Sequence, residues 1–114
     1  MDKGLVLSQI GEFGFINAIK KLIATDSSVL RGIGDDAAVL RFSQNKYLLL
    51  TSDMLIEDVH FKRNMKPFDI GHKALACSIS DIAAMGGLPK HAVISIGLPK
   101  DLSVSYAKNL YKGI

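Results

Sequence analysis

Four aspartates in this sequence occupy positions where a carboxylate could bind a metal ion. Asp35 and Asp36 lie in "GIGDDAA", Asp53 ends the run "LLLTSD", and Asp81 lies within "CSISDIAAM". Each is at or beside an apolar stretch, where a carboxylate loses hydration and needs compensation. Taken alone, the Asp35 and Asp36 pair fits a solvated turn somewhat better than a site. Asp81 shares a helix face with apolar residues, so we expect it to be partly buried.

These carboxylates would require a cation if the fold brought them together. Two unit charges about 4 Å apart repel by roughly 4 kcal/mol at an effective dielectric constant near 20. The hydroxyls of Thr51 and Ser52 precede Asp53 directly, and hard oxygen ligands select magnesium or calcium over zinc. Such a set suits Mg²⁺ shared with phosphate oxygens. By themselves, residues 51–53 fit a strand end with a hydroxyl cap equally well.

His60 is a candidate for contacting a phosphate or a polar ring. In an alternating segment it would point away from Val59 and Phe61, towards solvent or a site. A lone histidine is more often structural, and we assign His72 and His91 to that role. The sequence has neither the G-x-x-x-x-G-K-[ST] phosphate loop nor a dinucleotide fingerprint. In a phosphoryl-transfer protein, metal ions would therefore have to hold the phosphates.

The hydrophobic pattern predicts the elements that would position these residues. Helical spacing covers about residues 11–24, and two apolar runs around "SQNK" predict an antiparallel hairpin over residues 37–42 and 46–52. The pattern of residues 59–61 predicts a short strand or an extended loop. A long helix of small residues follows Pro67, with Asp69 as N-cap and a glycine stop at residues 86–87. Its alanines, serines and cysteine predict close packing against another backbone element.

Two further elements complete the chain. "KHAVISIGLP" predicts a β-branched strand ending at Pro99, and the last helix begins with Asp101 or Ser103 as its cap. Adjacent strands come without intervening helices, which favours an α+β fold with a mixed, mostly antiparallel sheet packed against helices. The length of 114 residues predicts a single domain over residues 1–114.

Composition excludes several function classes. The chain is 48% apolar and 22% charged, as in folded proteins, and its net charge of +3 comes from scattered Lys and Arg, which argues against nucleic-acid binding. A single cysteine, Cys77, excludes an internal disulfide, and we expect it to be a buried structural thiol. Without an apolar membrane span or a signal peptide, we expect no membrane partner and a cytoplasmic location.

Several motifs taken in order resemble the N-terminal half of the thiamine-monophosphate kinases, a family in the aminoimidazole ribonucleotide synthetase superfamily. The motifs are "GEFGFI", "GIGDDAAVL", "LLLTSDMLIEDVHF", "SISDIAAMGGLPKHAVISIGLP" and "LYKGI". The resemblance implies an enzyme that phosphorylates thiamine monophosphate to thiamine diphosphate, with ATP as co-substrate and several Mg²⁺ ions. It also implies a homodimer in which the sheets of two N-terminal domains form a barrel.

The resemblance assigns roles residue by residue, and it implies no side-chain nucleophile. The histidine of "E-x-V-H-F" contacts thiamine monophosphate, which matches His60, and a tyrosine of the closing helix lies near the nucleotide, which matches Tyr111. Asp35 belongs to the same motif as the metal ligands but has a less defined role. The implied metal ligands are Asp36, Thr51, Ser52, Asp53 and Asp81.

Family members continue beyond this chain into a glycine- and aspartate-bearing segment and a second domain that covers the substrates. We therefore expect little or no kinase activity from the 114-residue chain alone. Two alternatives stay open. One is another ATP-using member of the superfamily, such as a purine-pathway synthetase or selenophosphate synthetase. The other is a non-catalytic dimerisation or regulatory module.

Overall fold

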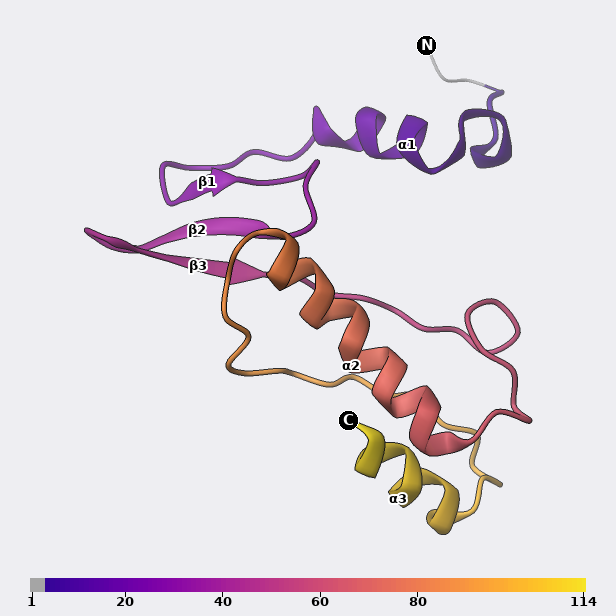
Figure 1. Cartoon of the computed structure of the whole chain (residues 1–114). Coiled ribbons are helices and arrows are strands. Elements are labelled where there is room, and N and C mark those ends of the chain that lie inside the picture. The colour runs from indigo at the N-terminus through magenta and orange to yellow at the C-terminus, as the bar shows by residue number, and fades with distance from the viewer. Residues whose placement is uncertain (1–3) are drawn as a thin grey trace. The chain divides into compact units, whose positions relative to one another are not determined.

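The computed structural model describes residues 4–114 and has an α+β fold, as the sequence predicted. The chain divides into two compact units, Met1–Leu50 and Thr51–Ile114. The elements in chain order are α1 (Leu7–Lys20), β1 (Val29–Arg31), β2 (Ala38–Ser43), β3 (Lys46–Leu50), α2 (Pro67–Ala84) and α3 (Val104–Gly113) (Figure 1).

The first unit contains a three-stranded antiparallel sheet in the order β1-β2-β3. The predicted hairpin is confirmed: β2 pairs with β3, and Val39 lies opposite Leu49. The pairing of β1 with β2 was not predicted, because this strand has only three residues and is followed by a glycine-containing loop. A run that short carries no readable alternation, so only the neighbouring strand reveals it.

Helix α1 begins and ends four residues earlier than the helical spacing predicted, at Leu7 and Lys20. At its start the Gln9 side chain accepts a hydrogen bond from the Val6 N–H at 2.9 Å, which satisfies one of the free amide groups of the first turn. The residue Gly11 has non-helical angles, with φ of 64°, and so interrupts the helix. Only glycine adopts that angle without steric strain, so the chain can kink at this residue between two helical stretches.

Helices α2 and α3 begin in different ways. Helix α2 has Pro67 at its first position, and its N-cap is Lys66 without a side-chain hydrogen bond. The prediction of Asp69 as N-cap was wrong: this carboxylate lies in the first turn, where it still favours the positive end of the helix dipole. Of the two predicted caps of α3, Asp101 and Ser103, the structure has Ser103, whose hydroxyl accepts the Tyr106 N–H at 3.1 Å.

Helix α2 ends at the predicted glycines. Gly86 has φ of 72°, and its N–H donates to the Ala83 carbonyl at 2.9 Å, while the Gly87 N–H donates to the Ile82 carbonyl at 3.0 Å. This pair of hydrogen bonds is the Schellman arrangement, in which a left-handed residue terminates a helix and satisfies its last carbonyls. The glycine stop is therefore confirmed in atomic detail.

The second unit is held together by α2 packed against α3 (Figure 1). Gly71 on α2 approaches the carbonyl of Leu110 so closely that any Cβ there would overlap it, and Gly113 on α3 stands in the same relation to the carbonyl of Phe68. Ile70 and Leu110 are buried at this contact. The close backbone approach that the small residues of α2 predicted is thus confirmed, although two glycines provide it.

The predicted strand over "KHAVISIGLP" was wrong, since the described chain forms no strand after β3. Residues 90–99 are exposed, and Val93 has a fractional exposure of 101%. The β-branched composition suits a strand, but a strand also needs a neighbour to accept its backbone hydrogen bonds, and this segment has none among residues 4–114.

Candidate functional site

Two hydrogen bonds join the segment after β3 to helix α2. The Thr51 hydroxyl donates to Asp81 Oδ2 at 3.0 Å, and the Ser78 hydroxyl donates to Asp53 Oδ2 at 2.9 Å. All four residues belong to the second unit. Thus three of the predicted site residues, Thr51, Asp53 and Asp81, are brought together, and Ser78 is a fourth that the sequence reasoning did not assign to the site.

The spacing of these residues explains the arrangement. Ser78 and Asp81 are separated by one turn of α2, so they lie on the same helix face. Thr51 and Asp53 are two positions apart, the spacing at which an extended chain directs side chains to one side. Each carboxylate therefore meets a hydroxyl from the opposite segment. A serine one turn before an aspartate was the signal that could have identified Ser78.

The surroundings of Asp53 and Asp81 favour the binding of a cation. Asp81 is half-buried, and neither Asp53 nor Asp81 forms an ion pair with any basic side chain of residues 4–114. Each carboxylate has one oxygen bonded to a hydroxyl, which leaves the other oxygen for a ligand. Carboxylate and hydroxyl oxygens are hard donors, the type that Mg²⁺ prefers, so the residues present fit that ion.

The described residues contain no cluster of three or more His, Cys, Asp or Glu that could hold a metal by itself. Mg²⁺ is commonly held by one or two carboxylates, with water and phosphate oxygens completing its coordination. Two carboxylates with adjacent hydroxyls are therefore a sufficient protein contribution when a phosphate is also bound. Ser52, between the paired residues, is exposed and available to join them.

The "GDD" motif lies in the first unit, where its two aspartates differ in environment. Asp35 accepts a hydrogen bond from the Arg31 guanidinium and another from the Asp36 N–H at 3.0 Å. These contacts, with Arg31 the larger contributor, lower the pKa of Asp35 below its ordinary value. The Asp36 carboxylate makes no side-chain hydrogen bond to another residue of the described chain. Of the two, Asp36 is the carboxylate left available for a ligand.

His60 lies in a tight turn, which corrects the expectation of an alternating strand or an extended loop. The turn is bounded by a bridge between Glu57 and Phe61, and Asp58 within it has φ of 66°. Aspartate is among the few residues that tolerate this left-handed conformation. Val59, next to His60 in the turn, has an exposed fraction of 71%. The turn, instead of strand alternation, determines where the imidazole points.

A backbone hydrogen bond orients the His60 ring. The Ile56 N–H donates to His60 Nδ1 at 2.9 Å. A nitrogen that accepts a hydrogen bond carries no proton, so in the neutral ring the proton is on Nε2. His60 therefore presents an Nε2–H donor, the group needed to contact a phosphate oxygen.

Charged contacts hold this turn in place where apolar burial is small. Arg63 binds Glu57 through two hydrogen bonds of 2.7 and 3.1 Å, and this pairing lowers the pKa of the Glu57 carboxyl. Lys73, on α2, donates to the His60 carbonyl. Helix α2 thus carries residues that bond both to the segment of Thr51 and Asp53 and to the turn that contains His60. The position of Lys73 on the same helix was not part of the predicted site.

Tyr111 lies on α3 with an exposed fraction of 52%. It forms no side-chain hydrogen bond to another residue in the described part of the chain, so its ring and hydroxyl are accessible to a ligand. Its predicted nucleotide contact stays a prediction.

The chain thus has an α+β fold, and carboxylate and hydroxyl groups of its second unit gather at helix α2. The family model described as "AIR synthase related protein, N-terminal domain" matches residues 34–114. That match covers more than half of the sequence, and the chain belongs to this family. No helix of residues 4–114 is both long and apolar enough to cross a membrane.

Individual relatives are similar over nearly the whole chain. A thiamine-monophosphate kinase of Aquifex aeolicus is 48% identical over 95% of this chain, and one of Bacillus subtilis is 44% identical over 90%. A solved structure of AaThiL complexed with AMPPCP and TMP matches 96% of this chain with a TM-score of 0.85 and 46% identity. The chain spans about a third of these proteins, 33%, 32% and 33% of their respective lengths.

Proposed function

We propose that this chain is the metal- and nucleotide-binding part of a kinase that transfers the γ-phosphoryl group of ATP to thiamine monophosphate. The observation that carries the proposal is the likeness, at a TM-score of 0.85 and 46% identity, to a structure complexed with AMPPCP and TMP. AMPPCP is an ATP analogue, so that relative binds both an ATP-like nucleotide and the phosphate acceptor. The carboxylate and hydroxyl oxygens that meet at α2 are suitable ligands for the Mg²⁺ ions that such a reaction needs.

We assign the magnesium ligands to Asp36, Thr51, Ser52, Asp53 and Asp81. Mg²⁺ bound there would neutralise phosphate charge, which is the main requirement of phosphoryl transfer. Asp35 is a weaker candidate, because Arg31 and the Asp36 N–H already occupy its two oxygens. Its role in this proposal is to hold the loop that presents Asp36.

The acceptor needs no side-chain nucleophile. A phosphate oxygen of thiamine monophosphate is largely anionic at neutral pH, so it can attack without a strong general base. His60 contributes its Nε2–H as a hydrogen-bond donor to the substrate, and Tyr111 contacts the nucleotide. The turn around His60 gives this donor a fixed direction before substrate arrives.

We also propose that the protein works as a homodimer in the cytoplasm. Strands β1 and β3 are the edges of the sheet, and residues 90–99 expose apolar side chains including Val93 and Ile94. Unpaired edges and exposed apolar segments favour association with a second copy. A free cysteine, Cys77, is compatible with a reducing compartment.

Thermal-shift measurements test the substrate assignment. In the presence of Mg²⁺ and AMPPCP, thiamine monophosphate should raise the melting temperature of the chain more than a purine-pathway ribonucleotide does. Thiamine without its phosphate is the matched control, and we expect it to have little effect. Equal shifts by all three compounds would contradict the assignment and favour an interaction module.

A further inference from the structure

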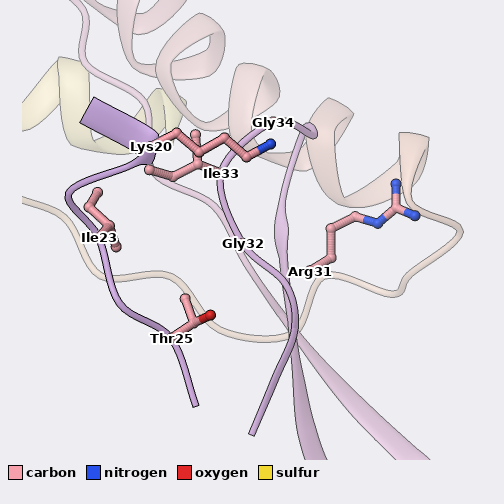
Figure 2. Close-up of a pocket in the computed structure, with 7 residues that line it drawn as sticks. All are labelled: Lys20, Ile23, Thr25, Arg31, Gly32, Ile33 and Gly34. Carbon is pink, nitrogen blue, oxygen red and sulfur yellow. The ribbon is translucent and has the colours of Figure 1, made fainter. Parts of the chain in front are cut away.

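The first unit has a cavity that none of the residues assigned to the kinase site lines. It has a volume of about 380 Å³ and lies between the end of α1, residues 23–25 and residues 31–34 (Figure 2). Pockets that hold small molecules commonly have volumes of about 300 to 1,000 Å³, so the space is sufficient for a small ligand.

A lysine ammonium borders this cavity on one side. Lys20 Nζ lies 3.3 Å from the position that a Cβ would take on Gly34, and Figure 2 shows the side chain extending past Ile33 towards that glycine. Lys20 forms no ion pair with an acidic group of residues 4–114. Its charge is therefore available to a ligand.

The nearby carboxylates do not compensate this charge, because they have other partners or lie outside the lining. Asp26 accepts hydrogen bonds from both the hydroxyl and the N–H of Ser28, and Asp35 binds Arg31. Asp36 is not among the residues that line the cavity. Arg31 does line it, but its guanidinium points away from Lys20 in Figure 2. The cavity thus has a positive edge and no opposing acid among the residues that line it.

The residues that line the cavity also carry neutral hydrogen-bond donors. The backbone N–H groups of Ile33 and Gly34 make no backbone hydrogen bond to another residue of the described chain, and the Thr25 hydroxyl has no partner there either. Gly34 has φ of 116°, a conformation that side-chain-bearing residues rarely adopt. Successive backbone N–H groups in a turn can form an anion-binding concavity.

We propose that the cavity bordered by Lys20, Thr25 and the amides of Ile33 and Gly34 binds a phosphate group directly, without a metal ion. The inference goes beyond the proposed kinase site, because it uses none of the magnesium ligands and requires no magnesium. The oxygens of a tetrahedral oxyanion can accept hydrogen bonds from an ammonium, a hydroxyl and two amides at once. A site with only two donors would leave some of these oxygens without a hydrogen bond. The phosphate comes from a nucleotide or from a free inorganic anion.

The test is a titration of ¹⁵N-labelled chain in EDTA with pyrophosphate and, separately, with ATP. We expect shifts at the amide signals of Ile33 and Gly34. Lys20→Gln should weaken the affinity by about fivefold, the size expected for an exposed charge contact. Lys21→Gln is the matched control, since it removes the same charge from the next residue, which does not line the cavity. Thr25→Val tests the hydroxyl in the same way.

The outcomes separate the two phosphate sources and also separate this site from the kinase site. Tighter binding of ATP than of pyrophosphate at these amides would assign the phosphate to a nucleotide, and the reverse order would assign it to a free anion. The shifts at Ile33 and Gly34 should persist in EDTA, where the kinase site holds no Mg²⁺. Equal losses in Lys20→Gln and Lys21→Gln, or no shifts at Ile33 and Gly34, would overturn the proposal.

Discussion

The Thr51 hydroxyl donates a hydrogen bond of 3.0 Å to Asp81 Oδ2, joining residues 30 positions apart in the chain. Thr51 follows strand β3 in the chain, and Asp81 lies in helix α2. Because this contact is part-buried, it fixes both the direction of the Asp81 carboxylate and the course of residues 51–53. The site is therefore organised before any ligand binds.

Removal of the Thr51 hydroxyl should destabilise the second unit. Thr51→Val keeps the side-chain shape but leaves Asp81 without its donor, and we expect a loss of about 1 kcal/mol in the free energy of unfolding. Thr51→Ser retains a hydroxyl and is the control. Urea denaturation measures both variants. If Thr51→Val and Asp81→Ala lower stability additively when combined, the hydrogen bond contributes nothing.

His60→Asn separates the two nitrogens of the imidazole. The asparagine amide oxygen can replace Nδ1 as acceptor for the Ile56 N–H, but it cannot replace the Nε2–H donor. The melting temperature should change little, whereas calorimetry in Mg²⁺ and AMPPCP should show binding of thiamine monophosphate weakened by about tenfold or more. His60→Ala, which loses both groups, should reduce stability as well. Unchanged binding by His60→Asn would exclude the assigned contact.

Gly71→Ala should weaken the packing of α2 on α3. A methyl group there would overlap the Leu110 carbonyl, so the helices must separate, at a cost of about 1–3 kcal/mol. Gly97→Ala is the control, because nothing lies within 4 Å of the added Cβ. Chemical denaturation followed by circular dichroism compares the two. Equal stabilities would show that the helix contact is looser than described.

The Asp35 and Arg31 pair predicts a specific pH dependence. Arg31, with help from the Asp36 N–H, lowers the pKa of Asp35 in the folded chain. A lowered pKa means that the ionised carboxylate is the stabilising form, so its contribution is present above about pH 4 and is lost as the pH falls through the lower folded value. Between about pH 5 and pH 3, Asp35→Asn should therefore lose less stability than the unmodified chain. Identical acid profiles would contradict this pairing.

The sequence predicted those parts of the fold that local chemistry determines. The β2 and β3 hairpin, the Ser103 cap and the glycine end of α2 depend on neighbouring residues, and all were confirmed. The error over residues 90–99 has the opposite cause. β-branched residues favour a strand, but pairing requires a partner that composition cannot reveal.

The candidate site, like the fold, could be predicted only in part from the sequence. Residue type and motif order identified Thr51, Asp53 and Asp81, which the structure brings together in one unit. The supporting contacts were missed, because Ser78 and Lys73 act through their positions on α2 relative to other segments. Hydrogen bonds between distant segments follow from tertiary packing, which no local pattern specifies.

The central claim, that residues 51–53 and α2 hold magnesium and nucleotide together, is tested most directly by calorimetric titration of the chain with AMPPCP. We predict binding that depends on Mg²⁺ and weakens by at least about tenfold in Asp53→Asn and in Asp81→Asn, since each loses a charged ligand. Asp101→Asn, an exposed aspartate outside the site, should bind as the unmodified chain does. A titration that shows no Mg²⁺-dependent component, or one that neither site substitution weakens, would contradict the account.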